Sequence, residues 1–134
     1  MGIPNTATAA RDISLAEIDL VKQLQIRASE LGHRLWRNNS GVGWAGGQVR
    51  VSEPTMVFMR PGDVLVRQAR ALHAGLAPGS SDLIGLTAQG RFIAVECKSE
   101  RGRATEGQEN FLETVHRLGG LGILARVVAD LVVP

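Results

Sequence analysis

Apolar residues recur at the spacing of an amphipathic helix in two separate parts of the chain. The first part follows the capping-box sequence Ser14-Leu15-Ala16-Glu17 and ends at Gly32. The second part begins with a similar sequence, Thr105-Glu106-Gly107-Gln108, and ends at Gly119–Gly120. The two apolar stripes consist of Leu20, Val21, Leu24, Ala28 and Leu31, and of Phe111, Leu112, Val115 and Leu118. The pattern therefore predicts one helix near each end of the chain.

Short runs of apolar and β-branched residues predict strands between and after these helices. Residues 82–86 and 91–98 are joined by the turn sequence Ala88-Gln89-Gly90, so we expect them to pair as an antiparallel hairpin. A further buried strand is expected close to the C-terminus, over residues 122–128. The segments that also resemble strands are 48–51, 55–60 and 63–68, with a turn at Pro61-Gly62.

The order of these elements predicts an α/β fold with a central mixed β-sheet flanked by helices. A length of 134 residues is typical of one compact domain. We place that domain over residues 13–134. Residues 1–12 are small, polar and rich in Ala and Thr, and are expected to form a disordered tail.

The composition of the chain excludes several classes of protein. The chain is 44% hydrophobic and 21% charged, as in ordinary folded domains, and contains no apolar run of about 18 residues that would span a membrane. The N-terminal residues lack the features of a secretory signal. Cys97 is the single cysteine, which excludes a disulfide framework and a structural zinc site. We therefore expect a cytoplasmic protein without a membrane partner.

The charge of the chain is concentrated in its middle third. Between His33 and Gly79 there are six Arg residues against two acids, and Arg has the planar set of donors that suits phosphate. This region is a candidate surface for a polyanion. A genome with Arg-favouring codons would explain the same bias, because 13 of the 15 cationic residues in the whole chain are Arg.

The strongest candidate for chemistry lies at the ends of the predicted hairpin. Asp82 begins its first strand, whereas Glu96 and Lys98 lie two residues apart near the end of the second and so share one face. The hairpin brings Asp82 towards Glu96. Two carboxylates, with the backbone carbonyl of Cys97 between Glu96 and Lys98, form the oxygen-rich donor set that Mg²⁺ and Mn²⁺ prefer. Lys98 would hold the attacking water or neutralise charge developing on a phosphate.

A structural explanation competes with this one. Glu96 and Lys98 are same-face neighbours on one strand and can form an ordinary ion pair at the strand end. The surrounding strand is mostly apolar, however, and two charged side chains on its inner side need a reason.

These motifs resemble those of the restriction-endonuclease-like PD-(D/E)xK superfamily. The residues that match the superfamily motif are Pro78-Gly79-Ser80-Ser81-Asp82, Val95-Glu96-Cys97-Lys98 and Gln108 on the following helix. Ser81 stands where the superfamily name has Pro. More narrowly, the chain resembles the virus-type replication-repair nuclease (VRR-NUC) family in its small stand-alone phage or prophage form. The first helix with Glu17 and the sequence Trp36-Arg37-Asn38-Asn39 fit that family too. The resemblance covers residues from about 14 to about 130.

The resemblance implies a metal-dependent endonuclease with a restriction-endonuclease-like core. By the family pattern, Asp82 and Glu96 would ligate Mg²⁺ or Mn²⁺, Lys98 would assist the water or the transition state, and Gln108 would orient around them. Glu17 would add a carboxylate from the first helix, although it also suits the cap of its own helix. Stand-alone members are associated with branched DNA, including four-way junctions, and act as homodimers.

The DNA-contacting residues are expected in the Arg-rich middle of the chain, and the candidates are Arg37, Asn38, Asn39, Arg67 and Arg70. Two alternatives share the expected fold. A sequence-specific restriction enzyme would need a recognition module for which little chain is left. A catalytically silent, accessory DNA-binding subunit would have no need to keep Asp82, Glu96, Lys98 and Gln108 together.

Overall fold

The computed structural model describes residues 15–43 and 50–134. The predicted tail, the predicted cap residue Ser14 and the beginning of the predicted strand at 48–51 lie outside the described residues. No helix in the described ranges is long and apolar enough to cross a membrane.

A four-stranded mixed sheet forms the centre of the molecule, and this confirms the predicted fold class. Its strands, in spatial order, are β1 (Arg34–Arg37), β4 (Leu83–Leu86), β5 (Phe92–Cys97) and β6 (Leu121–Ala125). Both β1 and β5 run antiparallel to β4, whereas β6 runs parallel to β5. The parallel pair needs a crossover connection, which helix α2 (Glu106–Arg117) supplies. The hairpin of β4 and β5 is the predicted one, whereas β1 is not among the predicted strands.

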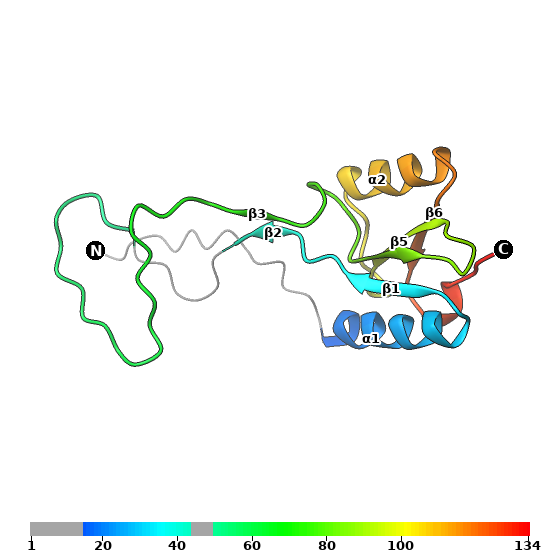
Figure 1. The fold of residues 1–134 in the computed structure, drawn as a ribbon, viewed down its shortest axis with the longest axis horizontal. Coiled ribbons are helices and arrows are strands. Elements are labelled where there is room, and N and C mark those ends of the chain that lie inside the picture. The colour runs from blue at the N-terminus through cyan, green and yellow to red at the C-terminus, as the bar shows by residue number, and fades with distance from the viewer. Residues whose placement is uncertain (1–14, 44–49) are drawn as a thin grey trace.

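The two helices cover opposite faces of this sheet (Figure 1). Helix α1 (Leu15–Glu30) packs its apolar stripe on one face, where Ile93, Val95 and Cys97 of β5 belong to the same buried cluster as Leu24. The alternate residues of β5, among them Glu96, face the side of α2. Because β5 is buried on both faces, a charged residue on it is withdrawn from water.

Helix α2 begins as predicted, and its backbone lies close to strand β6. The hydroxyl of Thr105 accepts a hydrogen bond from the Gln108 amide, and the Gln108 side chain accepts one from the Thr105 amide, which completes a capping box. A Cβ atom added at Gly122 of β6 would overlap with the Leu112 carbonyl oxygen. Glycine at this position therefore allows the helix to approach the strand.

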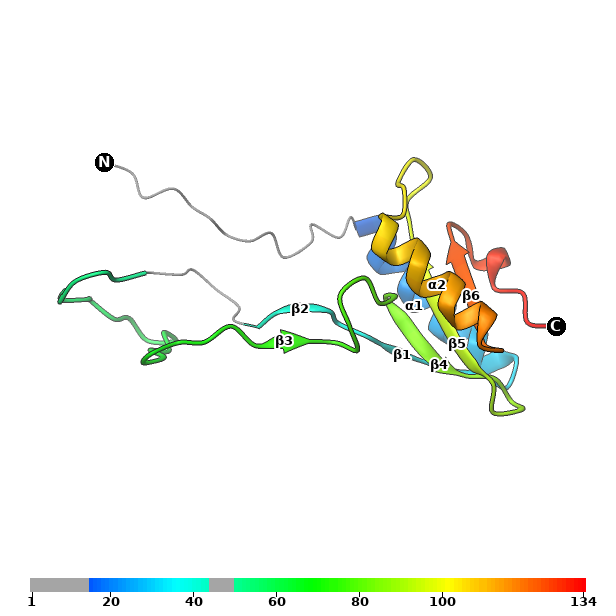
Figure 2. The ribbon, with the colours of Figure 1, turned by 90° about the horizontal axis from the view of Figure 1, so that it is seen from above.

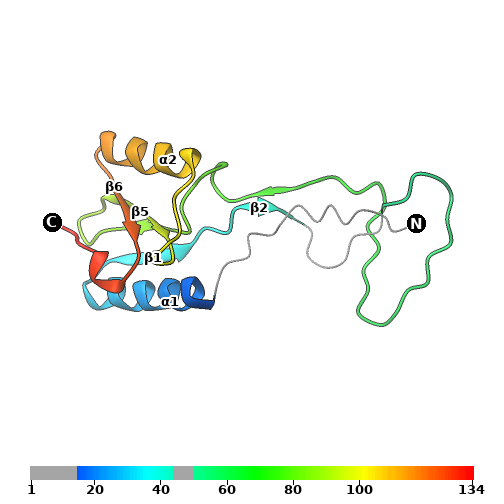
Figure 3. The same cartoon turned by 180° about the vertical axis from the view of Figure 1, so that it is seen from behind.

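The C-terminal part differs from its prediction in where the strand ends. β6 stops at Ala125, and the chain then turns into the short 3₁₀-helix η1 (Val128–Asp130), which contacts α1 (Figure 3). The side chain of Asp130 accepts hydrogen bonds from the amides of Arg126 and Val127. These two N–H groups lower the pKa of the Asp130 carboxyl.

The segment between β1 and β4 extends away from the core (Figures 1 and 2). It begins and ends with a short antiparallel pair, β2 (Gly41–Val42) and β3 (His73–Ala74). The predicted strands at 55–60 and 63–68 are wrong, because residues 50–72 contain no strand. The turn at Pro61-Gly62 does form, closed by a hydrogen bond from the Asp63 amide to the Arg60 carbonyl (3.0 Å). Its flanking residues are exposed throughout, and an isolated hairpin without a surface to pack against is marginal in water.

Candidate active site

Asp82 and Glu96 lie opposite each other at one end of the sheet. Leu83 pairs with Val95, so the next step of the antiparallel register places Asp82 against Glu96. Directly opposite residues of such a pair share a face and have Cβ atoms about 4.5–5.5 Å apart. One carboxylate oxygen of Asp82 accepts a hydrogen bond from the Cys97 amide at 2.9 Å. The structure thus brings two of the predicted metal ligands together.

Glu96 and Lys98 form a buried ion pair. The Lys98 Nζ atom lies 3.1 Å from Glu96 Oε1, and the Lys98 and Glu96 side chains are 8% and 0% exposed, respectively. An ion pair at the surface is worth little, but removing one partner of a buried pair leaves an uncompensated charge. The geometry of Glu96 and Lys98 is therefore compatible both with a structural ion pair and with a catalytic role. They differ in what else Lys98 does.

Asn38 fixes the turn that precedes Asp82. It is 9% exposed, and its side-chain amide donates to the Ser80 hydroxyl (2.7 Å) and to the Ser81 carbonyl (2.9 Å). Its side-chain oxygen accepts from the Leu76 amide, and its own backbone amide donates to the Asp82 carbonyl. Asn38 is one of the predicted DNA contacts. Its side chain, however, makes these hydrogen bonds within the fold, and they position the turn before Asp82.

Two glycines bring the same turn to the beginning of α2. Gly79 has a φ of +81°, and a Cβ atom there would lie 2.8 Å from the backbone carbon and oxygen of Gly107. The close contact of these two backbones places Asp82 on the same side of the sheet as Gln108. The side chain of Gln108 is buried, and its oxygen is held by the capping box; its amide nitrogen makes no hydrogen bond within the described chain.

The residue after Lys98 is held from two sides. The Ser99 amide donates to Glu17 Oε1 of α1 (3.1 Å), and the Ser99 carbonyl accepts from Arg126 Nη1 (2.5 Å). Arg126 Nη1 also donates to the carbonyls of Glu100 and Gly102. Glu17 therefore reaches the end of β5, as the prediction of a helix-borne carboxylate requires. Sequence reasoning misses Arg126, because nothing in the sequence connects it to a loop 24–27 residues earlier.

The remaining candidate residues fall into two places. Arg37 is exposed at the end of β1, where it pairs in register with Leu83, next to Asp82; Asn39 follows close by and is exposed too. Arg67 and Arg70 are exposed and belong to the segment between β2 and β3, which extends away from the sheet (Figure 2). The structure thus separates the predicted DNA-contacting residues into a group beside the carboxylates and a distant group.

Among residues 15–43 and 50–134, no three His, Cys, Asp or Glu side chains are arranged to hold a metal ion together. A pair of carboxylates is nevertheless a suitable donor set for Mg²⁺, which usually retains several waters and binds proteins through one or two carboxylates. The donors at this end of the sheet fit such an ion.

Comparison with known proteins identifies the domain. A family model described as the VRR-NUC domain matches residues 22–129, which cover the sheet, helix α2, most of α1 and all residues of the site except Glu17. The comparison with curated proteins gives no match. The mixed sheet between two helices is consistent with a restriction-endonuclease-like core.

The positioning role of Asn38 predicts a loss of stability on substitution. Asn38→Ala removes three side-chain hydrogen bonds and leaves buried partners unsatisfied, so the free energy of unfolding should fall by about 1–3 kcal/mol. Urea denaturation measures this change, with the exposed neighbour Asn39→Ala as the control, for which a change within about 0.5 kcal/mol is expected. Equal stability of the two variants would contradict the assignment.

Proposed function

The chain belongs to the VRR-NUC family, and from this premise we propose that it is a metal-dependent endonuclease that hydrolyses phosphodiester bonds in branched DNA. The family establishes a nuclease domain. The observation that carries the finer proposal is the placement of Asp82 opposite Glu96, with Lys98 ion-paired to Glu96 in the same buried corner.

Asp82 and Glu96 are the proposed ligands of Mg²⁺ or Mn²⁺. The N–H and C=O of a strand residue point to the same side, so the Cys97 carbonyl faces the side on which its amide donates to Asp82, and we assign it as a further oxygen ligand. A bound divalent cation would supply Lewis-acid activation of the phosphate and lower the pKa of a water. The negative charge that Lys98 only partly offsets would favour a cation at this position.

Lys98 is the proposed catalytic cation. An ammonium cannot ligate a metal, but it can donate hydrogen bonds to a water or to a phosphate oxygen while Glu96 holds it in place. In a site with little water, a fixed positive charge stabilises developing negative charge more strongly than in solution. Glu96 would thus have two roles, as a ligand and as the group that orients Lys98.

Gln108 and Glu17 support this centre from the two helices. The Gln108 amide nitrogen, left over by the capping box, is available to orient a water or a phosphate oxygen. Glu17 brings a carboxylate of α1 to Ser99, directly after Lys98. Because Glu17, Asp82 and Glu96 are not arranged to hold one ion together, we propose that Glu17 acts on the metal through a bound water, and that its bond to Ser99 positions it for this role.

Branched DNA is the proposed substrate, and a homodimer the proposed active form. A four-way junction presents two symmetrically placed strands, which a two-fold dimer can cut in the same way. Segment 50–72 offers a surface for such a dimer. Its large apolar side chains Met56, Phe58 and Val64 are 99%, 85% and 84% exposed, and an apolar surface of this kind usually marks an interaction site.

The dimer predicts a concentration-dependent mass of twice the 14.3 kDa of one chain in analytical ultracentrifugation. Phe58→Ser should weaken association at least tenfold, because it removes a large apolar group from the proposed interface. Ile26→Ser, at an exposed apolar position on α1, serves as the control. A monomer at the highest concentrations of the cleavage assay would refute the dimer.

Cleavage itself is tested with labelled four-way, flap and linear duplex DNA in Mg²⁺, Mn²⁺ or EDTA. We expect cleavage with either metal, the highest rate on a branched substrate, and none in EDTA. Asp82→Asn should lose at least a hundredfold in rate, about 2.7 kcal/mol of barrier, because Asn can still accept from Cys97 but brings no charge to the cation. Asp19→Asn, on the exposed side of α1, is the matched control.

A folded protein that binds these substrates but cleaves none of them with either metal would be an accessory DNA-binding subunit. Asp82→Asn with the rate of the parent would remove Asp82 from the site.

Lys98→Arg separates the catalytic role from the ion pair. Arginine keeps a positive charge against Glu96, so the fold should survive, whereas the compact ammonium is replaced by a planar group with different donor directions. We expect the cleavage rate to fall about a hundredfold with the melting temperature retained. Lys22→Arg, on the exposed side of α1, is the control. A folded Lys98→Arg variant with a rate within about twofold of the parent would reduce Lys98 to an ion-pair partner.

A further inference from the structure

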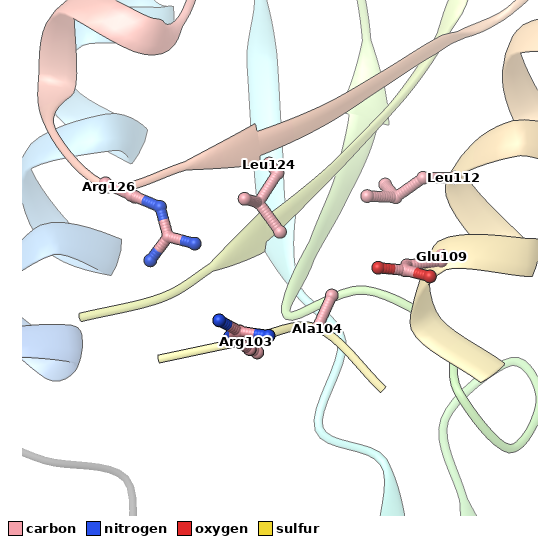
Figure 4. Close-up of a pocket in the computed structure, with 6 residues that line it drawn as sticks. All are labelled: Arg103, Ala104, Glu109, Leu112, Leu124 and Arg126. Carbon is pink, nitrogen blue, oxygen red and sulfur yellow. The ribbon is translucent and has the colours of Figure 1, made fainter. Parts of the chain in front are cut away.

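The structure contains a pocket of about 500 Å³, and Figure 4 shows the residues that line it. It lies between the loop that follows β5, the helix α2 and the strand β6. Its lining residues are Arg103, Ala104, Glu109, Leu112, Leu124 and Arg126. None of them is among the candidates that the sequence offers.

The pocket is adjacent to the site. Leu124, one of its lining residues, is the register partner of Glu96 in the parallel pair of β5 and β6, so the two side chains share one face of the sheet. Neighbouring strands lie about 4.8 Å apart. Successive phosphates of one DNA strand are spaced by about 3.4 Å of helix axis. The pocket therefore begins one strand away from Glu96, within reach of the phosphate next to one that is held at Glu96 and Lys98.

The guanidinium group of Arg126 is held in an orientation that suits anion binding in this pocket. Its Nη1 atom is fixed by the three loop carbonyls, whereas its Nε and Nη2 atoms make no hydrogen bond within the described chain. Its guanidinium group lies on the side of the pocket in Figure 4. A guanidinium held in place by part of its donors loses little entropy when the others bind phosphate.

Arg103 adds a second positive charge to the pocket. Its side chain is exposed and makes no hydrogen bond within the described residues. Glu109 is the single acid in the lining, so the pocket has a net charge of +1 from two Arg and one Glu. Leu112 and Leu124 provide an apolar surface suited to a sugar.

We propose that this pocket is a subsite for the phosphate next to the scissile phosphate of the cleaved DNA strand, with Arg103 and Arg126 as its anion-binding residues. The proposal rests on the proposed nuclease function and adds two DNA-binding residues to it. Arg103 and Arg126 thereby contribute to where along the strand the DNA is held, separately from the chemistry at Asp82 and Glu96.

The test compares Arg103→Ala with Arg101→Ala. Both residues are exposed on the same loop and carry the same charge, but only Arg103 lines the pocket. The probe is a labelled four-way DNA junction in EDTA, so that affinity is measured by fluorescence anisotropy without cleavage. Removing one Arg–phosphate interaction weakens binding about tenfold and reduces the slope of log affinity against log salt by about one.

We expect Arg103→Ala to show both changes and Arg101→Ala to show at most a twofold loss with the slope of the parent. Glu109→Gln should bind more tightly, because a repulsive charge is removed from the pocket. Equal effects of the two arginine variants, or no effect of Arg103→Ala, would overturn the subsite. Because binding is measured without turnover, these outcomes are separate from a failure of the cleavage assay, which concerns the proposed function.

Discussion

The carboxylate of Glu96, buried in one of the two inner strands of the sheet and held 3.1 Å from the ammonium of Lys98, is the constraint around which this domain is organised. Withdrawing two charges from water costs several kcal/mol for each ion, and the attraction between them only partly offsets this cost. A leucine pair would fill the same space without that cost. The proposed nuclease function explains why a buried ion pair is present despite its cost, because binding a metal and a phosphate requires charges that are fixed in a site with little water.

Backbone contacts between distant segments bring the other groups to this pair. Gly79 packs on Gly107, so the turn before Asp82 reaches the beginning of α2, and Asn38 holds that turn through buried hydrogen bonds. Glu17 accepts a hydrogen bond from the backbone N–H of Ser99, and Arg126 donates one to the backbone carbonyl of the same residue. The site is therefore assembled from both helices and the ends of all four strands of the central sheet, and its precision depends on hydrogen bonds to backbone atoms at least as much as on side-chain pairs.

Local signals in the sequence account for the hairpin of β4 and β5 and for the capping box of α2, because a turn or a cap is specified by residues a few positions apart. The closeness of Asp82, Glu96 and Lys98 to one another follows from that hairpin. The strands predicted within segment 50–72 do not form, because its apolar residues have strand-like spacing but no surface within the described chain to pack against. Asn38 and Arg126 act through contacts 24 to 43 residues away, which no local pattern reveals.

We propose that Asp82 and Glu96 together bind the divalent cation of this nuclease domain. Crystals of the protein soaked in Mn²⁺ test it most directly, because the anomalous signal of manganese locates the ion independently of activity. We expect an anomalous peak between the carboxylates of Asp82 and Glu96, beside the Cys97 carbonyl, and the loss of this peak in EDTA. A protein that cleaves DNA with Mn²⁺ but whose crystals show the ion elsewhere, or show no peak at these carboxylates at saturating Mn²⁺, would contradict the claim.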